Sequence, residues 1–193
     1  CNYCNRRYDC VNESRPGVTS TLLSPDQALV YMGRVLEREP RISVAGIAGP
    51  GDPFANPDET LETMRLIRKQ YPDTILCLSS NGLGVAPHVP ELAAIGVSHV
   101  TITVNAVDPA ISGRIYAWVR DGKIIYRGRQ AAELLLARQL EAIRLLKEHG
   151  VTVKVNTIVI PGINDQHLPA VAATMQELGV DLLNCMALFP SAE

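Results

Sequence analysis

The sequence lacks a long apolar run: no stretch approaches the roughly 20 residues that a helix needs to span a bilayer. It also lacks an excess of charge of either sign, because 18 Lys and Arg residues stand against 20 Asp and Glu residues, for a net charge of −2. A protein that binds nucleic acid or an anionic membrane surface usually carries a basic excess. We therefore expect a globular chain that binds neither nucleic acid nor membrane.

The N-terminus lacks an initiator methionine and the charged and apolar segments of a signal peptide. The chain instead opens at Cys1, within a cluster of cysteines. We expect the 193 residues to be a fragment whose first residues are missing. With 47% hydrophobic residues, the fragment has enough apolar material for one core, and a single domain is expected.

The cysteines are unevenly placed along the chain. Of the five cysteines, Cys1, Cys4 and Cys10 lie within the first ten residues, whereas Cys77 and Cys185 lie far from them. An odd, clustered set is a poor framework for disulfides in a chain of this size. A cytoplasmic location is expected, and clustered thiols there bind metal more often than they pair. The alternative is that these thiols, Cys185 above all, are buried structural residues.

Segments with helical periodicity alternate along the chain with short apolar runs. A capping box at 24–27, with proline at the first helical position, marks the start of the first helix. Helices are expected over residues 25–39, 57–71, 87–95, 131–149 and 168–178. Strands are expected over residues 42–47, 74–79, 100–104, 151–160 and 182–188. Strands and helices that alternate at this spacing form βαβ units and a parallel sheet.

Residues 117–126 interrupt this alternation and read as a β-hairpin around the Asp121-Gly122 turn. A sixth strand is expected before the cysteine segment. Periodicity leaves open whether the sheet is open or a partial barrel. In both architectures the chemistry lies at the C-terminal ends of the strands. Glycine-rich and polar segments gather at those ends, which favours an enzyme over a scaffold.

The segment Cys1-Asn2-Tyr3-Cys4 is a CxxC motif. Alone it is compatible with a thioredoxin-like redox pair, half of a zinc site or part of an iron–sulfur site. A redox pair usually opens a helix, but residues 5–20 are polar and rich in Gly, Pro and Arg. A four-cysteine zinc site needs a second CxxC, and the sequence has none. Ligation of an iron–sulfur cluster, with a third thiolate upstream, fits best.

The same segment resembles the last two cysteines of the radical SAM signature CxxxCxxC, where SAM is S-adenosylmethionine. Residues 4–18, Cys-Asn-Arg-Arg-Tyr-Asp-Cys-Val-Asn-Glu-Ser-Arg-Pro-Gly-Val, are more specific, because they resemble the NifB family of nitrogenase-cofactor maturases. The resemblance covers essentially the whole chain, through 49–53, 79–82, 103–109, the hairpin and 160–165. It implies a partial (β/α)6 TIM-like barrel, with residues 1–193 as a radical SAM core domain. The first signature cysteine is absent from the chain.

The resemblance implies a [4Fe–4S] cluster that is held by three thiolates, Cys1 and Cys4 among them, and that binds SAM at its open iron. The residues it assigns to the cofactors are Tyr3, Gly49, Gly51, Asp52, Asn81 and Asn105. Each assignment has a structural alternative. Tyr3 is otherwise a packing residue, the glycine-rich loop only a tight turn, and each asparagine a cap of the turn that follows it.

The resemblance also implies that Cys10 and Cys77 help to hold a second iron–sulfur cluster, which is a substrate. Cys77 lies among apolar neighbours, so a buried, inert thiol is its alternative. Glu13 is a candidate iron ligand or proton carrier near that cluster, and its alternative is a role as a helix cap or a solvated residue. The four histidines, at 88, 99, 149 and 167, have no ligand spacing between them.

The reaction implied by the resemblance is the radical-based fusion of [4Fe–4S] substrate clusters around a carbide, to give the precursor of the nitrogenase cofactor. SAM serves as methyl donor and radical source, in a lyase-type enzyme. The implied partners are iron–sulfur cluster donors, scaffold or carrier proteins for the cofactor, and an electron donor. The alternatives are another radical SAM enzyme, such as a molybdopterin-type cyclase or a peptide maturase, and a non-enzymatic cluster-binding scaffold.

Overall fold

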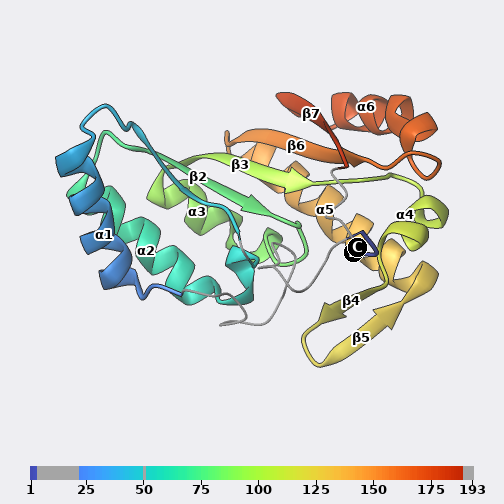
Figure 1. The fold of residues 1–193 in the computed structure, drawn as a ribbon, viewed down its shortest axis with the longest axis horizontal. Coiled ribbons are helices and arrows are strands. Elements are labelled where there is room, and N and C mark those ends of the chain that lie inside the picture. The colour runs from blue at the N-terminus through green and yellow to red at the C-terminus, as the bar shows by residue number, and fades with distance from the viewer. Residues whose placement is uncertain (4–21, 50, 189–193) are drawn as a thin grey trace.

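Five parallel strands form the central sheet in the part of the chain that the structure describes. The structure is a computed structural model that describes residues 1–3, 22–49 and 51–188. The strands pair in the order β1-β2-β3-β6-β7, each parallel to the next (Figure 1). Their bounds are Val44–Ile47 for β1, Ile75–Ser80 for β2, Val97–Thr103 for β3, Thr152–Val159 for β6 and Leu182–Ala187 for β7.

Among the described residues, six α-helices alternate with these strands. They are α1 (Pro25–Arg38), α2 (Pro57–Gln70), α3 (Val89–Ile95), α4 (Pro109–Ile115), α5 (Gly128–Glu148) and α6 (Leu168–Glu177). The predicted capping box starts α1: the Ser24 hydroxyl accepts from the Gln27 backbone N–H, and the Gln27 side chain accepts from Ser24. No helix of the described residues is both long and apolar enough to cross a membrane.

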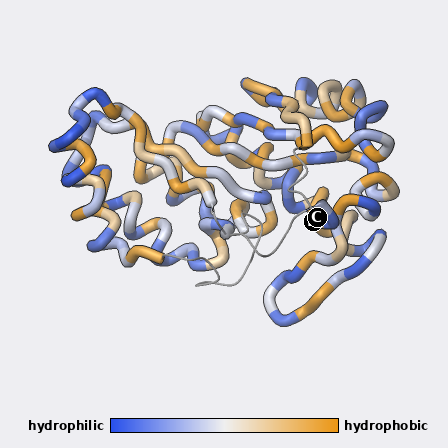
Figure 2. The backbone as a smooth tube through the Cα atoms, viewed as in Figure 1, coloured by the Kyte–Doolittle hydropathy of each residue, from blue (hydrophilic) through white to orange (hydrophobic). Residues whose placement is uncertain are grey.

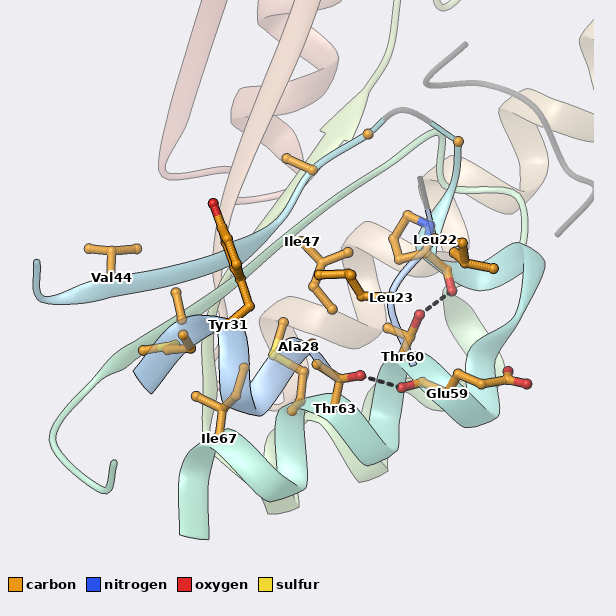
Figure 3. A pocket seen from close by; sticks show the side chains of 18 of the residues that line it. Leu22, Leu23, Ala28, Tyr31, Val44, Ile47, Glu59, Thr60, Thr63 and Ile67 are labelled. Atoms are coloured by element: carbon orange, nitrogen blue, oxygen red, sulfur yellow. Dashed lines mark hydrogen bonds between the residues drawn. The ribbon is translucent and has the colours of Figure 1, made fainter. Parts of the chain in front are cut away.

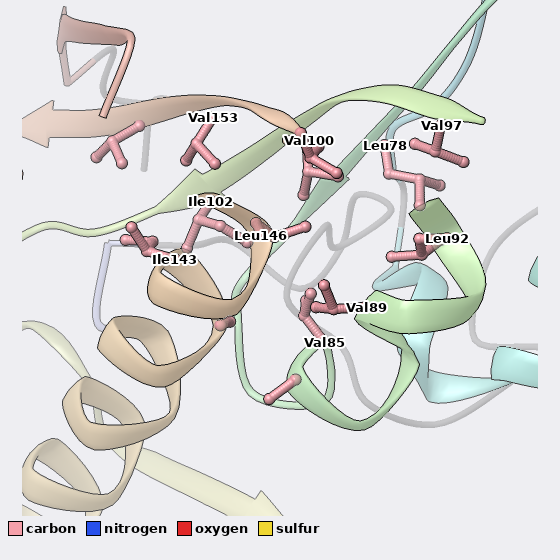
Figure 4. Packing of buried hydrophobic residues seen from close by; sticks show 14 of the residues in the cluster. Leu78, Val85, Val89, Leu92, Val97, Val100, Ile102, Ile143, Leu146 and Val153 are labelled. Atoms are coloured by element: carbon pink, nitrogen blue, oxygen red, sulfur yellow. The ribbon is translucent and has the colours of Figure 1, made fainter. Parts of the chain in front are cut away.

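The main hydrophobic core lies between one face of the sheet and helices α2, α3, α5 and α6. On β6, Val153 and Val155 are fully buried, and they share this core with Ile143 and Leu146 of α5 (Figure 4). Successive side chains of a strand point to opposite faces, so Lys154 lies on the other face, where it is half-buried. The sheet therefore has a helix-covered apolar face and a more polar face.

The strand order decides between the two architectures that periodicity left open. Each strand pairs with the next one of the sheet along the chain, and the core helices lie on one face. A doubly wound sheet reverses its strand order and carries helices on both faces. The consecutive order is that of a barrel segment, which confirms the predicted partial barrel. The sixth strand, predicted before the cysteine segment, stays a prediction.

The structure differs from the sequence-based expectation in three elements. Helix α4 was not predicted, because its seven residues include Gly113 and two β-branched isoleucines. Its start nevertheless carries a signal: the Asp108 carboxylate accepts from the Ala110 backbone N–H, and proline follows Asp108. Strand β3 begins at Val97 rather than at residue 100, since backbone pairing with β2 extends through polar residues. Helix α5 begins at Gly128 rather than at residue 131.

The predicted hairpin is present and forms a separate two-stranded sheet. Its strands are β4 (Trp118–Asp121) and β5 (Ile124–Arg127), which pair antiparallel across the predicted turn. The ribbon stands apart from the central sheet, beside α4 and α5 (Figure 1). Val119 and Tyr126 attach it to a second hydrophobic cluster, which includes Ile115 of α4 and Leu135 of α5.

Candidate functional site

The loops that follow β1, β2, β3 and β6 are bonded to one another at the C-terminal edge of the sheet. Asp52, in the loop after β1, accepts from the backbone N–H of Asn81, which follows β2. Asn105, after β3, accepts from the backbone N–H of Ile158 near the end of β6, and Asn164, after β6, donates to the Asn105 carbonyl. This edge is where an α/β sheet places its ligand site.

Asp52 is a buried crosslink between the first two loops. Its carboxylate accepts from the Asn81 N–H at 2.7 Å, from the Phe54 N–H at 3.0 Å and from the Ser80 hydroxyl at 3.0 and 3.1 Å. Burial raises the pKa of the Asp52 carboxyl, while the bonds from Asn81, Phe54 and Ser80 oppose that rise. With 6% of the residue exposed, Asp52 fixes the loops. Its predicted contact with the cofactor stays a prediction.

The glycine-rich loop after β1 depends on glycine for its backbone conformation. Gly49 has a φ of 40° and Gly51 a φ of 89°, both in the left-handed region that residues with a side chain rarely adopt. Both residues are half-buried beside Asp52. The structural alternative for this loop, a tight turn, is therefore confirmed. The binding of SAM by this loop stays a prediction.

Asn81 caps the turn that follows it, as its structural alternative proposed. Its side-chain oxygen accepts from the Leu83 N–H at 2.7 Å, and its backbone carbonyl accepts from the Gln139 amide at 2.9 Å. The residue is half-buried at the sheet edge. The predicted ligand contact of Asn81 stays a prediction, and the side-chain nitrogen is the group that would make it.

Asn105 links the cysteine segment to the sheet. The residue is 1% exposed, and its amide nitrogen donates to the Tyr3 hydroxyl at 3.3 Å and to the Tyr116 hydroxyl at 3.0 Å. Its oxygen accepts from the Ile158 N–H at 2.9 Å. Burial raises the pKa of Tyr116 to about 12, so its hydroxyl stays protonated at neutral pH. Asn105 thus uses both amide hydrogens inside the protein. Its predicted contact with the cofactor stays a prediction.

Asn2 anchors the cysteine segment from the other side. Its backbone N–H donates to the Ile115 carbonyl and its side-chain amide to the Arg114 carbonyl, each at 2.7 Å. The last carbonyls of a helix have no partner within the helix, so Asn2 caps the C-terminus of α4. Cys1 and Tyr3 flank Asn2 and pack against the second hydrophobic cluster. The segment is therefore held at the ends of β3 and β6.

Two buried amides that the sequence analysis did not single out complete the edge. Asn164 is 0% exposed; it donates to the carbonyls of Asn105 and Ile158 and accepts from the Ile160 N–H. Gln139 of α5 donates to the carbonyls that follow β2 and end β3. A polar residue on the apolar face of a predicted helix was the available signal for Gln139.

Cys77 lies in the middle of β2, three residues before its last residue, Ser80. Its neighbours Leu76 and Leu78 are buried in the core, so Cys77 lies on the opposite face and is half-buried. Burial raises the pKa of its thiol. Gly46 pairs with it in register, and a Cβ at Gly46 would lie 2.7 Å from the Cys77 sulfur. The missing side chain at Gly46 leaves room for this thiol.

Three predicted site residues, Cys4, Cys10 and Glu13, lie outside the described residues. Within the described ranges, no group of three or more His, Cys, Asp and Glu residues is placed to hold a metal ion. The fit of an iron–sulfur cluster therefore rests on Cys1, a half-buried thiol of the kind that such clusters prefer. Cys185 is exposed on β7, so the alternative that it is buried is wrong.

A separate apolar groove of about 540 Å³ lies between α1, β1 and α2 (Figure 3). Leu23, Tyr31 and Ile47 line it, and Gly49, Gly51 and the Asp52 loop border it at the C-terminal end of β1. The groove follows the edge of β1, away from the second hydrophobic cluster that holds Cys1 and Tyr3.

The chain is similar over its whole length to several curated proteins. The protein most similar among those we describe is the FeMo cofactor biosynthesis protein NifB of Chlorobaculum tepidum, which is 58% identical over all 193 residues, or 46% of that relative. NifB of Klebsiella pneumoniae is 51% identical over 194 aligned residues, or 41% of its length. NifB of Azotobacter vinelandii is 46% identical over 193 residues, or 38% of its length. The chain thus spans less than half of these relatives.

Solved structures show the same fold at low sequence identity. The protein anSMEcpe, solved with bound AdoMet and a peptide, has a TM-score of 0.67 at 16% identity over 93% of this chain and 48% of that chain. Methylornithine synthase (PylB) has a TM-score of 0.64 at 12% identity over 95% of this chain and 51% of that chain. The radical SAM superfamily model matches residues 1–175. The chain therefore belongs to the radical SAM superfamily.

Proposed function

We propose that this chain binds a [4Fe–4S] cluster and SAM at the C-terminal edge of its sheet, and that its parent protein builds the precursor of the nitrogenase cofactor. The observation that carries the proposal is the anchoring of the cysteine segment at that edge, by Asn2 to α4 and by Tyr3 to Asn105. The whole-chain similarity to NifB proteins supports the choice of nitrogenase chemistry.

Cys1 and Cys4 are the cluster ligands that this chain contributes, and the proposal assigns a third thiolate to the parent protein. When bound, the cluster and SAM supply a carbon-centred radical. The residues of the chain bind and orient the cluster and SAM. The loop that contains Gly49 and Gly51 offers backbone groups to SAM. Asp52 holds this loop against the loop of Asn81, and Asn105 positions Tyr3.

The substrate of the proposed reaction is a set of [4Fe–4S] clusters that are fused around a carbide, in a lyase-type step. Cys10 and Cys77 are the proposed ligands of a substrate cluster, with Glu13 as ligand or proton carrier. Cys77 lies on the face of the sheet away from the helices, and Gly46 leaves space beside its sulfur. The proposed partners are cluster donors, a scaffold or carrier for the product and an electron donor, in the cytoplasm.

The experiment compares Cys4→Ala, Cys10→Ala and Cys185→Ala in the full-length parent, reconstituted anaerobically. Cys4→Ala removes a cluster ligand, so 5′-deoxyadenosine formation under dithionite should be lost. Cys10→Ala should keep 5′-deoxyadenosine formation but fail to mature apo-nitrogenase. Cys185 is exposed on β7, so its variant is the control and should keep both activities.

Two outcomes contradict different parts of the proposal, the substrate-cluster site and the cluster ligands. Wild-type parent that binds one [4Fe–4S] cluster by iron analysis and EPR would refute the substrate-cluster site and leave the radical SAM assignment intact. Equal loss of 5′-deoxyadenosine formation in the Cys4 and Cys185 variants would refute the assignment of the cluster ligands.

A further inference from the structure

The β4–β5 hairpin has an inner and an outer face, which the pairing register defines. Val119 lies opposite Tyr126, and both pack inward against the second hydrophobic cluster. Because side chains alternate along a strand, the next pairs in each direction point outward. These outer pairs are Trp118 with Arg127 and Arg120 with Ile125.

The outer face and the turn of the hairpin carry positive charge. Arg120, Lys123 and Arg127 lie within eight residues, and Lys123 and Arg127 are exposed. Asp121 is the hairpin's acidic residue, and its carboxylate lies 3.6 Å from the Arg138 guanidinium of α5. The negative charge of Asp121 therefore faces a cation of α5, whereas Lys123 and Arg127 are left to solvent. Arg120 is half-buried, and its guanidinium donates to the Gly122 carbonyl.

The outer face also carries an apolar side chain that the fold does not bury, Ile125, which is 51% exposed. Its neighbour Ile124 pairs with Asp121 and points to the opposite face beside the turn, where it is 58% exposed. Figure 2 shows this hydrophobic stretch of the hairpin between hydrophilic segments on both sides. Arginine, aromatic and large aliphatic side chains that surround a small apolar centre are the composition of a protein–protein contact.

The hairpin and the cysteine segment pack against one hydrophobic cluster. Val119 and Tyr126 of the hairpin belong to the same hydrophobic cluster as Cys1 and Tyr3. A protein that binds the outer face of the hairpin would therefore lie at the end of the sheet where the cysteine segment is anchored, on the far side of the ribbon.

We propose that the hairpin is the docking surface for an acidic electron-carrier protein of the ferredoxin type. The inference rests on the proposed function, because a reductive site at the cysteine segment needs such a carrier. The carrier's acidic surface complements Arg120, Lys123 and Arg127, and an apolar patch on it covers Ile125. A polyanion such as nucleic acid fits less well, since the cations are few and the chain has a net charge of −2.

The test measures binding of a plant-type [2Fe–2S] ferredoxin, an acidic protein, to the full-length parent by anaerobic calorimetry. The variant Lys123→Glu/Arg127→Glu reverses two exposed charges of the hairpin, so its Kd should rise about tenfold or more. The control Lys69→Glu/Arg144→Glu makes the same change of net charge on exposed positions of α2 and α5, and its Kd should stay within about twofold of wild type. Ile125→Ser should weaken binding without changing charge.

A carbodiimide, which joins amines to carboxylates, should link Lys123 to the ferredoxin. Absence of ferredoxin binding by the wild-type parent, or equal weakening in the hairpin and control variants, overturns the proposal. It is also overturned if the hairpin variant loses binding to phosphatidylglycerol vesicles while its ferredoxin Kd is unchanged, because the surface is then a membrane contact. Cluster content and dithionite-driven 5′-deoxyadenosine formation, measured on the same preparations, report separately on the proposed function.

Discussion

At the scale of single residues, the site edge is built from buried polar groups whose bonds are satisfied inside the protein. Asn105 and Asn164 are almost completely buried, and each makes three side-chain hydrogen bonds. A buried amide that loses its partners costs the full desolvation of the groups left behind. Such residues fix the positions of loops and strands without contacting a ligand themselves.

Replacing Asn105 with alanine should therefore destabilise the protein strongly. The change leaves the Ile158 N–H and the Tyr3 and Tyr116 hydroxyls without this partner, at a cost of about 2–4 kcal/mol in the free energy of unfolding. Asn81→Ala is the matched control, because its side chain is half-buried and makes one hydrogen bond, and it should cost about 1 kcal/mol. Urea unfolding measures both, and equal costs would contradict the assignment of Asn105 as a buried crosslink.

Asp52 should give the stability of the protein a pH dependence of unusual sign for a carboxylate. Burial raises its folded-state pKa above the ordinary value of 3.8, so the folded state binds the proton more tightly than the unfolded state. The stability that Asp52 contributes is then full below about 3.8 and is lost as the pH rises through the raised pKa. Asp52→Asn lacks this titration.

The measurement is the urea unfolding free energy of wild type and Asp52→Asn at several pH values between 4 and 7. The stability of wild type relative to the variant should decrease as the pH rises across this window. The bonds that asparagine cannot accept shift the variant by a constant amount and do not change this slope. A difference that grows with pH would show that hydrogen bonds, rather than burial, dominate the pKa of Asp52.

At the scale of elements, the register of β1 against β2 controls the space around Cys77. Gly46→Ala places a Cβ 2.7 Å from the Cys77 sulfur, which should cost about 1–3 kcal/mol of stability. In a Cys77→Ala background the sulfur is gone, so the same change should cost less than about 1 kcal/mol. Thermal unfolding of the four proteins of this double-mutant cycle measures the coupling. Additive costs would mean that Gly46 is needed for another reason.

Periodicity and capping predicted the long elements of the fold. The capping box of α1, the apolar runs of the strands and the Asp121-Gly122 turn are local signals, and each produced the predicted element. Helix α4 was missed because its local propensity is weak, and the carbonyls at its end are bonded by Asn2, more than a hundred residues away. Contacts of that kind depend on tertiary packing and leave no local pattern.

In the candidate site, too, features with a local sequence signal were predicted and features that depend on tertiary contacts were not. Strand-end loops were predicted to meet, and the Asp52–Asn81 and Asn105–Ile158 bonds confirm that they do. The roles within that edge were less predictable, because sequence does not show burial. Asn105 was assigned to the cofactor, and the structure shows that its amide bonds Tyr3, Tyr116 and Ile158 within the protein. Its assignment to the cofactor stays a prediction.

At the scale of the whole molecule, β1 is an edge strand of the sheet that the described residues form. Within the described residues β1 pairs with β2 on one side, and α1 has no buried residue although its apolar face lines the groove beside β1. Val44 of β1 is 48% exposed and Tyr31 of α1 is 62% exposed. A strand before the cysteine segment would be joined to β1 by a right-handed crossover through α1, so we predict the sixth strand at this edge.

A longer form of the chain, with residues before Cys1, should therefore protect this edge. Hydrogen exchange at the backbone amides of residues 44–47 and of α1 should be slower in the longer form than in the 193-residue chain, because an added strand pairs with β1 and covers the groove. The amides of α5, which pack in the main core, serve as the internal control and should exchange at similar rates in both forms. Unchanged exchange at β1 would place the sixth strand elsewhere. A uniform slowing that includes α5 would indicate a global gain in stability rather than pairing at this edge.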